Sequence, residues 1–360
     1  MKPAPPDFPP GLPQKPVTMT DIARHLGVSQ STVSRALHND PRVTDEKRKQ
    51  ILNAARELNF QPNPMATALS IQRHVQGKPT FHATLAWLNA YPDPKKLRGY
   101  RHFDLCWKGA TETARRLGFH LEEFVLNEKT SLRRLEHILH ARGIAGVMIV
   151  PQGLSVIDWE RIDWSKFSVV RLGRSAGTPQ FHCIQSDQYY SGVLATHRMR
   201  ESGYRRIGLV SPLDPFHYFV GGYLSTAARL PKSHRVPPLF FVEPLPGDWQ
   251  RILDRWIRQH KPDAILTGYP QLPDTLATLG YRVPADLGLA ALNIYDCPID
   301  AGIDQLPEEI GYAAIQFLTS LINVNERGIP GTPREVLIKG KWHDGKLLPR
   351  LSGKAKSGER

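Results

Sequence analysis

One stretch of the sequence, residues 20–40, constrains the fold more than any other. It reads TDIARHLGVSQSTVSRALHND, and in it a Gly-Val-Ser turn joins two short segments that carry apolar residues at helical spacing. Gly27 permits a sharp turn of the backbone, and Ser29 can begin the next helix as its N-cap. The other side of this second helix is polar and free to contact a partner, because its apolar side is narrow and consists of Val33, Ala36 and Leu37.

The same stretch belongs to a predicted bundle of three helices over residues 17–61. The first helix begins at Thr18, which can form a capping box with Asp21. The third helix begins near Thr44 and ends before Pro62. The three helices share one small core, and a unit of this size has no room for a catalytic cleft.

The polar side of the second helix has two possible meanings. Its amide and guanidinium groups, on Gln30 and Arg35, match the donor and acceptor pattern of base edges in the major groove of DNA. The alternative is an ordinary packing module whose polar side is only solvated. The turn chemistry, the capping and the polar composition all agree with helix-turn-helix geometry, and a net charge of +13 suits a polyanionic partner. We therefore favour DNA binding.

These residues also support a resemblance. Residues 17–70, VTMTDIARHLGVSQSTVSRALHNDPRVTDEKRKQILNAARELNFQPNPMATALS, resemble the DNA-binding headpiece of the lactose-repressor (LacI/GalR) family almost without gaps. The resemblance implies that Gln30, Ser31 and Arg35 read bases. It also implies that Ser29, Thr32, Ser34 and Asn39 contact phosphates or hold the helix in place. The predicted DNA-contacting set further includes Thr18 and Asn63, which begin the first and the fourth helix.

Residues 62–79 are predicted to form a hinge helix and a linker. The helix is too short to be stable by itself in water. In the family it folds when two subunits meet over the operator, and a leucine from each subunit enters the minor groove; Leu69 matches that leucine. A plain linker in which Leu69 faces the core is the alternative. Family hinges commonly carry Arg-Ser before the leucine, whereas this chain has Thr67 and Ala68, so we expect one DNA contact to be missing.

From about Thr80 the sequence changes to short apolar runs, such as ATLAWL, GVMIVP and DAILTGY, that alternate with amphipathic segments. This rhythm is typical of parallel α/β structure and is long enough for two sheets. Residues 203–210, 280–293 and 334–345 resemble the effector-binding core of the same family, which is similar to periplasmic sugar-binding proteins. The predicted fold is an N-terminal all-α helix-turn-helix headpiece followed by an α/β periplasmic-binding-protein-like (type I) core of two parallel-sheet subdomains.

The predicted domain boundaries follow from these segments. We expect a disordered Pro-rich leader over residues 1–16, the headpiece over 17–61, the hinge and linker over 62–79, the core over 80–346 with crossovers near 185, 295–305 and 333, and a disordered basic tail over 347–360. The tail has no heptad repeat, so we expect a homodimer and no zipper-linked tetramer.

The predicted effector pocket departs from the family pattern. Asn293 stands where the family often has an aspartate, and Phe219 stands where it usually has an arginine. Tyr269 and Pro270 replace an Asn-Asp pair. Because a sugar site must satisfy the hydroxyls that it buries, a plain hexose effector is not expected. The predicted wall of the pocket consists of His217, Phe219, Tyr269, Asn293 and Asp296.

Two functions stay open at this point. The first is a dimeric, sequence-specific transcriptional regulator, expected to repress, that binds a near-palindromic operator and responds to a small-molecule effector. The second is an effector-blind regulator or architectural DNA-binding protein with a vestigial pocket. A receptor-type carrier would need an export signal and no headpiece, and we do not expect one.

Other chemistry is not indicated. The sequence lacks nucleophile-elbow, P-loop and dinucleotide-binding motifs, so neither an enzyme nor a cofactor is expected. The histidines at 137 and 140 have no further ligand nearby, so we expect no metal site. The basic run KKLRGYRH at 95–102 is predicted to be a solvated loop. No apolar run reaches about 18 residues, and a cytoplasmic, nucleoid-associated protein with three reduced core thiols, Cys106, Cys183 and Cys297, is expected.

Overall fold

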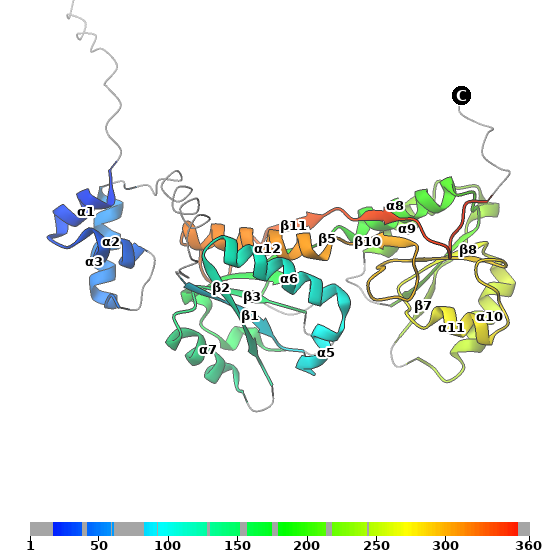
Figure 1. Ribbon diagram of the computed structural model, residues 1–360, viewed down its shortest axis with the longest axis horizontal. Coiled ribbons are helices and arrows are strands. Elements are labelled where there is room, and N and C mark those ends of the chain that lie inside the picture. Colours follow the sequence, from blue (N-terminus) through cyan, green and yellow to red (C-terminus); the bar gives the residue numbers. More distant parts are fainter. Residues whose placement is uncertain are drawn as a thin grey trace, which may run out of the picture.

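The computed structural model of the protein contains a three-helix headpiece and two α/β subdomains (Figure 1). It describes residues 17–37, 42–58, 60, 83–91, 93–127, 130–151, 157–174, 179–213, 218–242 and 245–351. Within these ranges, no helix is long and apolar enough to cross a membrane.

The headpiece consists of α1 (Met19–Leu26), α2 (Gln30–Leu37) and α3 (Asp45–Glu57). The three helices bury their apolar sides against one another, which is how segments this short become stable. The shared core consists of Ile22, Ala23, Val33, Ala36, Val43, Ile51, Ala54 and Ala55. The predicted three-helix bundle is confirmed.

The first subdomain is built on a six-stranded sheet in which all neighbouring strands run parallel. Alternate residues of one strand enter opposite faces: Leu85 lies in the core beneath α6 and α12, and Ala86 lies in the core beneath α7. Figure 1 shows these helices on the two faces. The strands, in spatial order, are β11 (Glu335–Ile338), β5 (His182–Ser186), β4 (Ser168–Leu172), β3 (Gly146–Ile149), β1 (Ala83–Asn89) and β2 (Phe119–Val125). The helices are α5 (Pro94–Gly99), α6 (Arg101–Arg116), α7 (Leu132–Ala141) and α12 (Pro307–Asn323).

The second subdomain repeats this arrangement with one antiparallel edge. Its sheet has the order β12 (Lys341–His343), β10 (Gly302–Asp304), β9 (Gly288–Ala291), β8 (Ala264–Thr267), β6 (Ile207–Pro212) and β7 (Leu239–Phe241). Only β12, which pairs with β10, runs antiparallel among these strands. One face is covered by α8 (Gln188–Glu201) and α9 (Phe219–Ala227), and the other by α10 (Trp249–His260) and α11 (Leu272–Thr278). The predicted fold class is confirmed.

In the part of the chain that the structure describes, the backbone crosses between the two sheets three times. The crossings lie at Asp187 after β5, at 305–306 after β10 and at 339–340 after β11. The third crossing was predicted near 333. It lies later because residues 335–338 still pair with β5 in the first sheet. The apolar pattern of this strand does not show which of the two sheets the strand joins.

The start of the predicted disordered tail belongs to the packed core. Leu348 is buried, the Leu289 amide donates to the Leu347 carbonyl at 2.8 Å, and the Leu351 amide donates to the Ser202 carbonyl at 2.9 Å. The hydroxyl of Tyr204 donates to the carbonyl of residue 349 at 3.0 Å. The prediction of disorder from residue 347 is therefore wrong for residues 347–351, where leucines cover the second subdomain. The remainder of the predicted tail, the leader and the hinge lie outside the described residues.

Candidate nucleic-acid interface and effector boundary

A capping box fixes the start of α1, the first helix of the headpiece. The Thr18 hydroxyl donates to Asp21 at 2.6 Å, the Thr18 amide donates to the same carboxylate at 2.9 Å, and the Asp21 amide donates back to the Thr18 hydroxyl at 3.4 Å. At the other end of α1, Gly27 has φ of 63°, which favours glycine, and the Val28 amide donates to the Ala23 carbonyl. These two ends set the angle at which α2 leaves α1.

Helix α2 has an exposed polar side and a buried apolar side. The Ser29 hydroxyl accepts from the Thr32 amide at 3.1 Å, as an N-cap does. Val33 and Ala36 are buried against α1 and α3. The side chains that face outward and are exposed include those of Gln30, Ser31 and Arg35. The backbone is thus held rigid while the three side chains predicted to read bases are accessible.

The hydroxyls predicted to contact phosphates or to hold the helix are already engaged with one another. The Ser29 hydroxyl lies 2.8 Å from that of Thr32 and 2.9 Å from that of Ser31. Ser34 is half-buried. Since one hydroxyl can both donate and accept, this chain of hydroxyls stabilises the first turn of α2 and still keeps acceptor and donor capacity for a phosphate.

A second group of polar residues lies where the two subdomains meet. Asp296, in the loop after β9 of the second subdomain, accepts from the His102 amide at the start of α6 in the first subdomain, at 3.3 Å. The Asn293 amide group donates to the other Asp296 oxygen at 2.7 Å, and Asn293 accepts from the Tyr295 amide at 3.1 Å. We call these contacts the subdomain boundary. Asn293 and Asp296 are paired within the chain, in contrast to the exposed side chains of Gln30 and Arg35 on α2.

Burial changes the acidity of the groups at this boundary. Desolvation raises the pKa of Asp296, and the His102 amide opposes this by stabilising the carboxylate. Burial also lowers the pKa of His102 to about 4, against the opposing effect of the Asp304 carboxylate, so its imidazole is neutral at pH 7. The Nδ1 atom of His102 is buried without a hydrogen-bond partner in the described part of the chain. A neutral, desolvated His102 therefore lies against the second subdomain.

Comparison with known proteins agrees with this architecture. Residues 18–63 match the family described as "Bacterial regulatory proteins, lacI family". The HTH-type transcriptional regulator MalR of Streptococcus pneumoniae is 25% identical over 319 residues, which cover 86% of this chain and 94% of MalR. The match thus spans the headpiece and both subdomains.

Residues 18–63 thus form a LacI-family DNA-binding domain. The chain is a DNA-binding transcriptional regulator, and it resembles such regulators over both the headpiece and the two subdomains. Two solved structures share its fold. The lac repressor dimer bound to operator and the anti-inducer ONPF has a TM-score of 0.51 at 20% identity and covers 93% of this chain and 100% of its own. The CelR–cellobiose complex has a TM-score of 0.52 at 17% identity and covers 92% and 99%.

Four of the predicted site residues lie outside the described residues. They are Asn39, Asn63 and Leu69 of the predicted DNA-contacting set and His217 of the predicted effector pocket. The first two fall within the residues matched by the family, and Leu69 lies beyond them.

The predicted wall of the effector pocket is divided by the fold. Asn293 and Asp296 meet at the subdomain boundary. Phe219, by contrast, is buried in the core beneath α8 and α9, and Tyr269 is buried in the core beneath α10 and α11, where its ring lies 5.2 Å from that of Phe241. The two aromatic rings replace polar family residues and fill the interior of the second subdomain, which only the tertiary packing reveals.

Sequence reasoning missed His102 and misassigned the run that contains it. Residues 95–102 were predicted to be a solvated loop, but α5 covers most of this run, Leu97 is buried, and His102 lies in the first turn of α6. The prediction was wrong because the basic residues hide a Pro-initiated helix: Asp93 caps it and Pro94 occupies its first position. Asp93 and Pro94 were therefore the sequence signal for the start of α5.

The three cysteines are buried, free thiols. Burial raises the pKa of Cys183 and of Cys297 to about 12 and raises that of Cys106 as well. A thiol of this kind is neither a good nucleophile nor a good metal ligand at neutral pH. The cysteines therefore serve as small core residues, as predicted.

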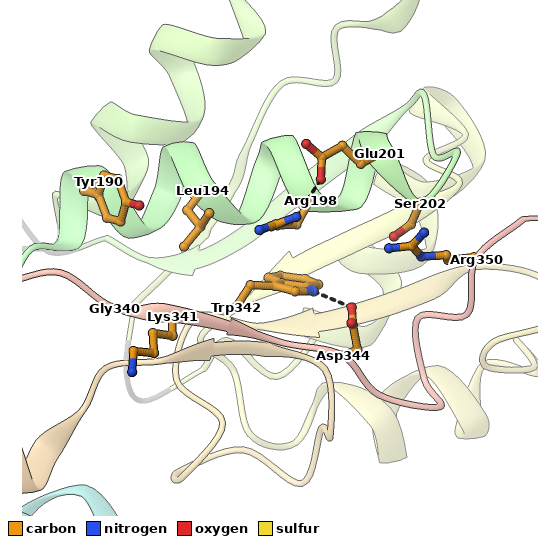
Figure 2. A pocket seen from close by; sticks show the side chains of 10 residues that line it. All are labelled: Tyr190, Leu194, Arg198, Glu201, Ser202, Gly340, Lys341, Trp342, Asp344 and Arg350. Atoms are coloured by element: carbon orange, nitrogen blue, oxygen red, sulfur yellow. Dashed lines mark hydrogen bonds and ion pairs between the residues drawn. The ribbon is translucent and has the colours of Figure 1, made fainter. Parts of the chain in front are cut away.

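A groove on the second subdomain was not predicted. It has a volume of about 350 Å³ and lies between α8 and β12 (Figure 2). Tyr190, Leu194 and Arg198 line it from α8, and Trp342 lines it from β12. No pattern within either segment indicates this groove, because its two walls are separated by more than a hundred residues of sequence.

Proposed function

We propose that this LacI-family regulator represses transcription as a homodimer that reads a near-palindromic operator with two copies of α2. The observation that carries the proposal is the exposed row of Gln30, Ser31 and Arg35 on a helix whose backbone is fixed by caps and buried residues. Arginine and glutamine can each make paired hydrogen bonds to one base, and two-fold symmetry places the second helix in the next major groove. A role on chromosomal DNA implies a cytoplasmic location.

We expect other headpiece residues to position α2 on the DNA backbone. Ser29, Thr32 and Ser34 lie beside the exposed row of predicted base-reading residues, where their hydroxyls suit phosphate contacts. Thr18 caps α1, and the positive end of the dipole of this helix suits a phosphate. We extend the proposal to Asn39, Asn63 and Leu69 by resemblance, with Leu69 as the minor-groove wedge of the predicted hinge helix.

We further propose that a small-molecule effector acts at the subdomain boundary. The CelR complex holds cellobiose, and the lac repressor structure holds ONPF, so two proteins that share this fold bind small molecules. In this chain a ligand at Asn293 has to replace the hydrogen bond from Asn293 to Asp296. Breaking that bond also loosens Asp296 from α6, so a ligand there changes the relation of the two subdomains. This favours an effector-responsive protein over the effector-blind alternative.

The experiment is a selection of bound duplexes from random DNA with the full-length protein, repeated in the presence of candidate metabolites. We expect an enriched sequence with two-fold symmetry, and a metabolite that lowers its recovery. Enrichment of no sequence over random competitor at moderate salt would refute operator recognition. Enrichment that no metabolite changes would instead support the effector-blind alternative.

A further inference from the structure

The groove between α8 and β12 combines an apolar floor with cationic groups. Leu194 and Trp342 are half-buried and pack against the core beneath α8 and α9, so one side of each faces the groove. Tyr190 adds a third apolar surface. A volume of about 350 Å³ lies within the range of small-molecule sites.

The indole of Trp342 is held in a fixed orientation. Its Nε1 atom donates to Asp344 at 2.7 Å, which satisfies the only polar atom of the side chain and uses the nearest carboxylate. Figure 2 shows the ring between α8 and the neighbouring strands, with Asp344 at its nitrogen end. A planar ring held in this way is a preformed stacking surface.

Two guanidinium groups lie at the groove. Arg198 is paired with Glu201 at 2.9 Å, which holds its side chain along α8 above Trp342 (Figure 2). Arg350 is exposed and forms no ion pair within the described residues. The groove thus has three cationic groups, Arg198, Lys341 and Arg350, and two carboxylates, Glu201 and Asp344, so its net charge is positive. The groove therefore suits a negative group better than a positive one.

We propose that this groove is a second ligand site, which binds a small planar aromatic carboxylate. The ring of the ligand stacks on Trp342 and contacts Leu194, and its carboxylate pairs with Arg350. None of the lining residues belongs to the subdomain boundary, so the site is separate from the effector site proposed above and does not depend on DNA binding. Gly340 lines the groove and lies in the third crossing, so a bound ligand also contacts the chain where it passes between subdomains.

The test is isothermal titration of the full-length protein with 2-naphthoate, a planar aromatic carboxylate. Two probes separate the contributions: 2-naphthalenemethanol keeps the rings without the charge, and acetate keeps the charge without the rings. We expect one 2-naphthoate per chain, bound at least about tenfold more tightly than either probe. Equal binding of 2-naphthalenemethanol, or no binding of 2-naphthoate, would overturn the proposal.

A pair of matched variants locates the site. Arg350→Gln should weaken 2-naphthoate binding about tenfold, whereas Arg229→Gln, at an exposed arginine of the same subdomain outside the groove, should leave it unchanged. Trp342→Leu should abolish binding, with circular dichroism to verify folding. If Trp342→Leu does not fold, the two arginine variants still decide. Equal affinity in the Arg350→Gln and Arg229→Gln proteins would place the ligand elsewhere and refute this site.

Discussion

The recognition helix and the subdomain boundary use polar side chains in opposite ways. On α2, Gln30 and Arg35 are exposed, and only the helix beneath them is fixed. At the boundary, Asn293 and Asp296 are tied to each other and to α6 by hydrogen bonds. DNA is a large partner whose base edges supply hydrogen-bond donors and acceptors. The polar side chains of a base-reading helix are therefore exposed before DNA binds. At the boundary, Asn293 and Asp296 are half-buried and lose part of their contact with water, so their hydrogen bonds to one another and to α6 compensate for that loss.

This difference also shows where regulation has to act. A small ligand would gain little binding energy at α2, because this helix is open to solvent. At the boundary, a ligand competes with a contact that joins residues 194 positions apart in sequence, so its binding energy is coupled to the arrangement of the lobes.

The largest expected effect concerns the buried imidazole at the boundary. The pKa of His102 is about 4 in the folded protein and near the ordinary histidine value of 6.5 in the unfolded protein. Only the unfolded state therefore takes up this proton as the pH falls between these two values. This group therefore costs about 3 kcal/mol of stability on going from pH 6.5 to pH 4. His102→Leu should remove that part of the acid sensitivity in denaturant unfolding, and His197→Leu, at an exposed histidine, should retain it. Identical pH profiles for wild type and His102→Leu would contradict a buried neutral ring.

The next effect concerns Arg35, one of the three exposed residues of α2 that are proposed to read bases. Arg35→Ala should weaken binding to the selected operator by about 1–3 kcal/mol and relax the preference at one base position in each half-site. Fluorescence anisotropy with the operator and with single-base variants measures both. Arg229→Ala, in the second subdomain, serves as the charge-matched control and should bind as wild type does. Unchanged selectivity in Arg35→Ala would remove this residue from base reading.

A smaller effect is expected from Asp296→Ala, which leaves the His102 amide and the Asn293 amide group without their acceptor. The loss should be about 1–2 kcal/mol, because the removed carboxylate itself was costly to bury. Hydrogen exchange should become faster at the first turn of α6. Asp274→Ala, at an exposed aspartate of α11, should change neither quantity. Unaltered exchange at His102 in the Asp296→Ala protein would show that the two subdomains are not held together here.

The smallest effect separates folding from DNA contact within the headpiece. Ser29→Ala removes the cap of α2 and should cost about 1 kcal/mol of headpiece stability. Ser29→Asp keeps a capping oxygen, so it should restore the stability measured by thermal unfolding. The added negative charge should still weaken operator binding if Ser29 faces a phosphate. Full operator affinity in Ser29→Asp would mean that Ser29 only holds the helix.

The sequence alone determined the headpiece and the class of the core. Capping residues, Gly27 and helical periodicity act over a few positions, so α1, α2 and α3 begin and end near their predicted limits. The alternation of apolar and amphipathic segments likewise predicted two parallel sheets, but it did not predict the antiparallel edge strand β12 of the second sheet. The exposure of Gln30 and Arg35 followed from the same local rules.

Only the tertiary structure decided which distant residues meet. It placed Phe219 and Tyr269 in the interior, brought His102 to Asp296, and packed residues 347–351 against the second subdomain. It also formed the groove in which Trp342 and Arg350 face α8, although α8 lies more than a hundred residues earlier in the sequence. The physical reason is that helix caps and periodicity depend on neighbouring residues, whereas burial and pairing at a boundary depend on how whole sheets pack, which no local pattern records.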